Sequence, residues 1–129
     1  MGAALAAVNI WEGVRVSGLD MALAIIDAQF ADTPGKQVVR DGVSASFPNS
    51  PPEQRVATRM LGFTIVSYSA DEARIVCVEA LPNAPQYTGE TITVVWVDGD
   101  WRMQVEDDGK LTAYGTITVD PGSYIPWSF

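Results

Sequence analysis

The chain has no histidine and a single cysteine, which removes most of the usual catalytic and metal chemistry. Nucleophilic triads depend on a base that titrates near neutral pH, and that base is normally histidine. Zinc sites are built largely from histidine and cysteine. One cysteine also excludes an internal disulfide. Because Cys77 lies in the apolar run 74–78, we predict a small buried side chain and not a reactive thiol.

Long apolar runs and clusters of basic residues are missing as well. No stretch reaches the roughly 20 apolar residues of a membrane span. The 8 basic residues are outnumbered by 16 acidic ones, which gives a net charge of −8. Such a charge repels phosphate backbones, so we expect no direct nucleic-acid binding. Residues 3–8 are too short and not apolar enough for a signal-peptide core, and we expect any membrane anchor to lie upstream of Met1.

The length of 129 residues and the 47% apolar content predict one globular domain, 1–129. The glycines are dispersed and form no P-loop. Asp98-Gly99-Asp100 opens like a calcium loop, but the twelfth position is Gly109, where a bidentate glutamate is required. We therefore predict a turn at this place, and neither a metal nor another cofactor.

Apolar residues at intervals of three and four predict helices in the first half of the chain. The expected helices cover 3–16, about 18–31, and a segment that restarts at Thr33-Pro34, because proline suits the first helical position. The predicted apolar stripes are Leu19, Leu23, Ile26 and Phe30 in the second helix, and Val38, Val39, Val43 and Phe47 in the third.

Helix starts are indicated by capping residues. Ser17 reads as the N-cap of the second helix, with Asp20 completing a variant of the capping box. In the same way, Ser50 and Glu53 predict a short helix through Arg59 after the proline-rich break.

From Leu61 onward the apolar period becomes two. Leu61, Phe63 and Ile65 are expected to share one face of a strand. Val66 and Tyr68 fall out of that phase, which predicts a bulge, and bulges bend sheets.

Further strands follow this one. Residues 73–80 are apolar on both faces, which predicts a central strand covered by helices on one side. The tail 111–129 alternates only weakly and ends in aromatic residues, so we expect it to pack back on the body.

The clearest local signal is a hairpin. Strands over about 88–97 and 100–106 flank Asp98-Gly99, and glycine takes the positive φ that a tight turn requires. Trp96 and Trp101 stand on either side of this turn, and by parity we expect them on opposite faces of the sheet. An exposed Trp96 would be an anchor for a protein interface.

Helices followed by antiparallel strands predict an α+β fold in which the helices cross one face of a curved sheet. This arrangement resembles the cone of the nuclear transport factor 2-like and cystatin-like superfolds. We expect the sheet to bury the apolar sides of the helices and to leave no room for a reaction centre.

The alternative is an apolar cavity in which a buried aspartate and a tyrosine move protons, since burial raises the pKa of such a carboxyl. Its candidate residues are Asp20 or Asp27 with Tyr68 or Tyr87. Without that cavity, Asp20 caps a helix and Asp27 lies on a solvent face.

Several motifs together resemble one family. They are the alanine-rich start at 3–8, the strand pair around 66–78, the hairpin TITVVWVDGDWR at 91–102, Asp107-Asp108-Gly109 and the closing YIPW at 124–127. The sequence looks like the soluble domain of conjugation proteins from actinobacterial mobile elements. These are TcpC-like and related to the bitopic inner-membrane assembly factors of type IV secretion.

The resemblance implies a nuclear transport factor 2-like domain on the extracytoplasmic face of the membrane, anchored in the full-length protein. It implies a non-enzymatic component of the DNA-transfer channel that contacts other channel proteins or further copies of itself. No catalytic residues carry over, and the interface candidates are Trp96, Tyr124 and Trp127. A small-molecule binder or an isomerase- or dehydratase-like enzyme of the same fold is the alternative. A phage or plasmid accessory protein that shares only the scaffold also stays open.

Overall fold

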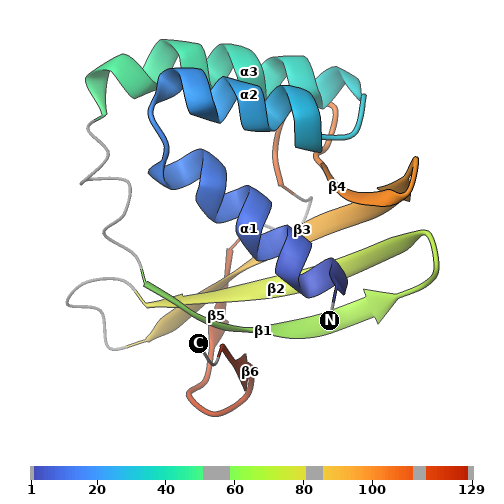
Figure 1. Cartoon of the computed structure of the whole chain (residues 1–129). Helices are drawn as coiled ribbons and strands as arrows, with labels where there is room; N and C mark the ends of the chain where they lie inside the picture. The colour runs from blue at the N-terminus through green and yellow to red at the C-terminus, as the bar shows by residue number, and fades with distance from the viewer. Residues whose placement is uncertain (1, 51–58, 81–85, 112–115, 128–129) are drawn as a thin grey trace.

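Figure 1 shows the computed structural model, which describes residues 2–50, 59–80, 86–111 and 116–127. Three helices lead into a sheet, as the sequence predicts. The short helix expected through Arg59 and most of the loop after Ala80 lie outside the described residues. In chain order the elements are α1 (Gly2–Val16), α2 (Leu19–Gln29), α3 (Pro34–Ser46), the 3-10 turn η1 (Phe47–Asn49), β1 (Arg59–Tyr68), β2 (Glu72–Ala80), β3 (Tyr87–Val97), β4 (Asp100–Gln104), β5 (Thr116–Val119) and β6 (Ile125–Pro126).

The three helices are confirmed, with differences at their ends and faces. Pro34 occupies the first position of α3, as predicted. The N-cap of α2 is Gly18, because the Ser17 hydroxyl donates to the Gly13 carbonyl in the last turn of α1. The predicted cap at Ser17 is therefore wrong. The prediction that Val38 belongs to the apolar stripe of α3 is also wrong, because its side chain is exposed.

The sheet is antiparallel throughout, in the order β4-β3-β2-β1-β6. The long strand β3 pairs with β2 along one edge. On its other edge, β5 pairs with its first residues and β4 with its last. The prediction that 73–80 forms a central strand is confirmed, because β2 lies between β1 and β3.

The predicted hairpin joins β3 to β4. Asp98 and Gly99 both have positive φ, 51° and 81°, as a two-residue type I′ turn requires. In a two-residue hairpin the residues equally far from the turn are direct partners, and Trp96 pairs with Trp101. Partners share a face of the sheet. The prediction of opposite faces for the two tryptophans is therefore wrong.

Strand β1 carries the predicted bulge, as a register shift between Ile65 and Ser67. A second shift, just before Gly62, was not predicted. It turns Leu61 away from Phe63, so that Leu61 packs on the outer side of the sheet and Phe63 on the helix side. The predicted common face of these two residues is wrong for this reason.

The two sides of the sheet are covered differently. On the helix side, α1 lies across β2, β3 and β4, and α2 and α3 form a second layer above it (Figure 1). On the outer side the tail returns, and Val119 packs on Val76 and Val78 with Tyr124 against them. The expectation that the tail packs on the body is confirmed. The largest fully buried side chains are Phe63, Ile26, Ile75, Ile92, Met103, Val78, Val94 and Cys77.

The described chain is thus an α+β fold, with three N-terminal helices packed against a six-stranded, antiparallel, curved sheet.

Candidate functional site

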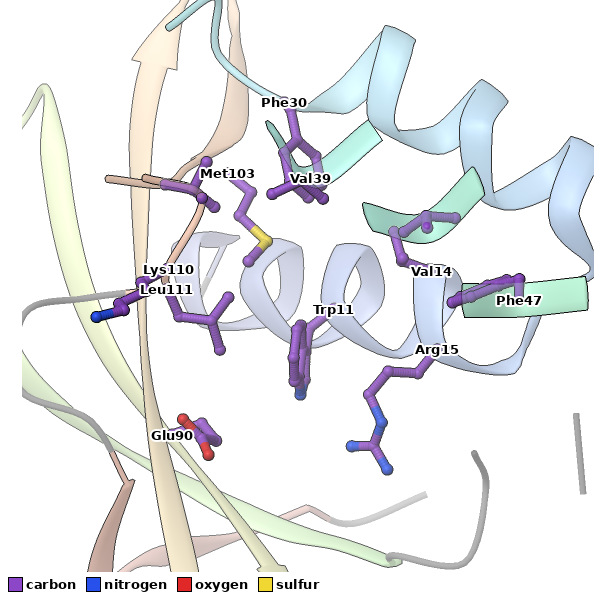
Figure 2. Close-up of a pocket in the computed structure, with 13 residues that line it drawn as sticks. Trp11, Val14, Arg15, Phe30, Val39, Phe47, Glu90, Met103, Lys110 and Leu111 are labelled. Atoms are coloured by element: carbon purple, nitrogen blue, oxygen red, sulfur yellow. The ribbon is translucent and has the colours of Figure 1, made fainter. Parts of the chain in front are cut away.

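A cavity of about 630 Å³ lies between α1, α3 and the helix side of β3 and β4. The cavity is within the size range of small-molecule sites. Figure 2 shows its lining, which is mainly apolar. The absence of a reaction centre therefore stays a prediction. The apolar lining includes Val14, Phe30, Val39, Val43, Phe47, Met103, Val105 and Leu111.

The helices explain why this space exists. Phe30 caps the end of α2 and bridges to Met103 of β4, and the Ala31 N–H donates to the Met103 carbonyl oxygen at 2.8 Å. These contacts hold the start of α3 close to the sheet. Helix α3 then runs along α2, so the apolar stripe of Val39 and Val43 faces the cavity.

Polar groups gather at one end of the cavity. The Trp11 indole N–H donates to Glu79 Oε1 at 3.2 Å, and Arg15 donates to the same oxygen at 2.9 Å. Arg15 also donates to Glu12 Oε1 at 3.0 Å. In Figure 2 the Arg15 guanidinium and the Glu90 carboxylate lie at this end, whereas the Lys110 amino group points away from the cavity. We call Trp11, Glu12, Arg15 and Glu79 the charged network.

The charged groups at this end influence one another. Burial raises the pKa of Glu12, the nearby Arg15 opposes that rise, and Glu79 adds to it. Burial raises the pKa of Cys77 to about 12, with further contributions from Glu79, Glu12 and Glu90. Of these residues, Arg15 and Glu90 also line the cavity, together with Lys110.

The four residues proposed for proton transfer do not meet at the cavity. Asp20 is exposed near the start of α2. Asp27 pairs with Arg40 at 2.7 Å, and the hydrogen bond from Arg40 lowers the pKa of Asp27, whereas a general base of this kind needs a raised one. Tyr68 is exposed at the far end of β1, and Tyr87 lies on the outer side of the sheet.

An exposed aromatic patch lies at the hairpin end of the helix side. The Trp96 and Trp101 rings meet edge to face with centroids 5.3 Å apart, and the Tyr68 ring is 6.2 Å from Trp101. Ile65 is exposed on the same side of the sheet, since it pairs with the buried Ile75. We call Ile65, Tyr68, Trp96 and Trp101 the aromatic patch.

The three interface candidates have different surroundings. Trp96 belongs to the aromatic patch and is exposed. Tyr124 is half-buried, with its ring 6.2 Å from that of Tyr87. Trp127 is also half-buried and lies 4.7 Å from the Phe63 ring. Of the three, only Trp96 presents a largely accessible aromatic surface.

Sequence reasoning missed the charged network. One signal was present: Glu79 ends the apolar run of β2, and a buried acid needs a partner. Its partner Arg15 is 64 positions away in the chain, so nothing local identifies it.

Two negative findings apply to the parts of the chain that the structure describes. No group of three or more His, Cys, Asp or Glu residues there is arranged to hold a metal ion. Among the described helices, none has both the length and the apolar character needed to cross a bilayer.

Comparisons with known proteins give one result. No curated protein and no solved structure matches the chain. Residues 1–126 match the family model described as Domain of unknown function (DUF8175), and the chain therefore belongs to that family.

Proposed function

We propose that this domain is a non-enzymatic assembly component of a conjugative DNA-transfer channel of the type IV secretion kind, acting through protein contacts. In this proposal it lies on the extracytoplasmic face of the membrane, is anchored there in the full-length protein, and does not bind DNA itself. The observation that carries the proposal is the aromatic patch, where Trp96 and Tyr68 are exposed on the helix side of the sheet. Aromatic side chains of this kind are frequent anchors of protein interfaces.

Two further features support this proposal. The sequence resembles transfer proteins along most of its length, with the hairpin at 91–102 as its most specific part. The residues proposed for proton transfer are dispersed over α2, β1 and β3 and do not form one site. We also propose that the fold is a nuclear transport factor 2-like cone.

Gene deletion tests the assembly role. Removing the gene from its mobile element should abolish conjugative transfer while the other channel proteins are still made, and restoring it should rescue transfer. Unchanged transfer would reject the proposal. A fusion to an enzyme that is active only outside the cytoplasm tests the location, and the proposal requires that activity.

The cavity favours a second candidate, a binding site for an uncharged, mainly hydrocarbon small molecule. Its 630 Å³ and its mainly apolar lining suit such a ligand. The neutral dye N-phenyl-1-naphthylamine is a suitable probe, because its fluorescence rises in apolar surroundings. Val39→Trp should abolish the signal by filling the cavity, whereas Met21→Trp, at an exposed position of α2, should not. Equal signals in both variants would exclude the cavity as the binding site.

A further inference from the structure

The aromatic patch is more exposed than an ordinary part of the sheet. Tyr68 is 62%, Trp96 45% and Ile65 43% exposed, although all three lie on the side that carries the main core. Trp101 is half-buried, and a side chain added at Gly2 would lie 3.6 Å from its indole nitrogen. The first turn of α1 therefore packs beside Trp101, and no described residue covers the rest of the patch. Contiguous exposed apolar surface of this kind marks interaction sites.

Four acids lie at the end of the sheet that carries this patch. Asp71 lies between β1 and β2, and Asp98 lies in the turn between β3 and β4. Glu72 and Asp100 are the first residues of β2 and β4, and their pairing with Val95 and Val97 directs their side chains to the outer side of the sheet, opposite the Trp96 ring. The Trp96 N–H donates to the Asp71 carbonyl oxygen at 2.8 Å, which holds the two connections side by side. We call Asp71, Glu72, Asp98 and Asp100 the acidic rim.

The acidic rim forms few ion pairs with basic side chains within the described chain. Within the described chain, Asp71, Asp98 and Asp100 are exposed and none of them takes part in an ion pair. Glu72 lies 3.5 Å from Arg74, and both side chains are largely exposed. The surroundings of the patch therefore carry a net negative charge, which adds to the overall charge of −8.

We infer that the aromatic patch and the acidic rim together bind a basic segment of a protein partner, with arginine or lysine side chains over the Trp96 and Tyr68 rings. This inference rests on the proposed function and names the surface and the partner chemistry that it requires. Cations are attracted to aromatic faces, and carboxylates beside the ring strengthen the attraction and speed the encounter. Apolar side chains of the same segment cover Ile65 and the exposed edge of Trp96.

The charge pattern argues against the other occupants of such a patch. In a symmetric dimer formed through this surface, the acidic rim of one subunit would lie opposite the acidic rim of the other. Like charges repel each other across such an interface. Nucleic acids and anionic membranes carry the same sign as the rim and are repelled. A basic protein segment is the occupant that satisfies both the aromatic rings and the carboxylates.

A defined peptide tests the inference. The probe is a fluorescein-labelled peptide of alternating arginine and leucine, and its binding is followed by fluorescence anisotropy at several salt concentrations. We expect saturable binding that weakens with salt. A matched peptide with glutamate in place of arginine should not bind. Equal binding of both peptides would overturn the inference.

Matched variants then locate the binding surface. Trp96→Ser should weaken binding about tenfold or more, as loss of a central aromatic anchor does, and Met21→Ser on α2 should leave it unchanged. The double variant Asp98→Asn with Asp100→Asn should weaken binding and reduce its salt dependence. Asparagine tolerates the left-handed backbone of Asp98, so the turn is expected to persist.

The charge control is the double variant Asp20→Asn with Asp41→Asn, which removes the same charge from exposed positions on α2 and α3. If it weakens binding as much as the change at Asp98 and Asp100, the peptide responds only to net charge and the inference is overturned. If the free protein self-associates and Trp96→Ser abolishes that association without any peptide binding, the occupant is a second copy, and the inference again fails.

Transfer assays separate this inference from the proposed function. If gene deletion abolishes transfer but the Trp96→Ser and rim variants transfer normally, the assembly role stands and this surface is not the one that serves it. If deletion has no effect on transfer, the proposed function fails, even where the peptide binds as expected.

Discussion

Replacing Arg15 by methionine tests the charged network, because Arg15 is the only described cation bonded to Glu79. The Glu79 side chain is only 8% exposed and that of Arg15 15%. Methionine retains much of the apolar length of arginine but leaves the buried Glu79 carboxylate with the Trp11 N–H as its remaining side-chain donor in the described chain. Removing one partner of a buried ion pair typically costs about 3–5 kcal/mol.

We therefore expect Arg15→Met to lower the free energy of unfolding by about 3 kcal/mol at pH 7. The loss reflects the uncompensated burial of Glu79, since the variant keeps most of the apolar contacts of the arginine stem.

Urea unfolding at pH 7, followed by circular dichroism, measures this loss. Arg40→Met is the matched control, since it breaks a pair with Asp27 of similar length, 2.7 Å, between more exposed side chains. Its effect should be clearly smaller than that of Arg15→Met. A loss below about 1 kcal/mol for Arg15→Met, or equal losses in the two variants, would refute the reasoning.

Three further predictions follow from single residues. Because burial raises the pKa of Glu12 above its ordinary value of 4.5, protonated Glu12 stabilises the folded state below pH 4.5, and this stabilisation is lost as pH rises through the raised value. The stability of Glu12→Gln relative to the wild type should therefore increase between pH 4.5 and 7, as measured by urea unfolding. Gly35→Ala should lower stability by about 2 kcal/mol or more because its Cβ would collide with the Glu106 carbonyl oxygen, whereas Gly42→Ala, in open space on the same helix, should raise it by about 0.5–1 kcal/mol in thermal or urea unfolding. With its pKa raised to about 12, Cys77 should stay unmodified by a disulfide reagent at pH 8 until the protein unfolds, and rapid labelling of the folded protein would contradict this.

Elements specified by short-range patterns could be predicted from the sequence. Alternation and the Asp98-Gly99 turn are local, and they predicted the hairpin and its two-residue turn, although the faces of Trp96 and Trp101 were predicted wrongly. The errors occurred where two local patterns compete. Ser17 lies between two alternatives, the N-terminus of α2 and the last turn of α1, and its hydroxyl donates to the Gly13 carbonyl in α1. Likewise, the second bulge in β1 changes the face of Leu61, although the residues alternate without interruption there.

The cavity and the charged network could not be predicted in this way, because they depend on distances between elements. Periodicity identifies the stripe of Val39 and Val43 on α3, but not whether it meets another helix or an open space. The bond from Arg15 to Glu79 joins α1 to β2 over a separation of 64 positions in the chain. By contrast, Trp96 was named as an interface candidate on the condition that its side chain is exposed, and the structure exposes it.

Helix α1 connects the two candidate sites. Its first turn packs beside Trp101 of the aromatic patch, and its last turns place Trp11 and Arg15 at the polar end of the cavity. Between them, Ala3, Ala4 and Ala7 are buried and small, so the helix can lie close against the sheet. A shift of α1 along the sheet would therefore move a wall of the cavity and the support of Trp101 together. The charged network opposes such a shift, because Arg15 and Trp11 are both bonded to Glu79 on the central strand. On this argument the network fixes the aromatic patch and the cavity relative to each other. A buried ion pair can have this structural role even where it adds little net stability compared with an apolar pair of the same size.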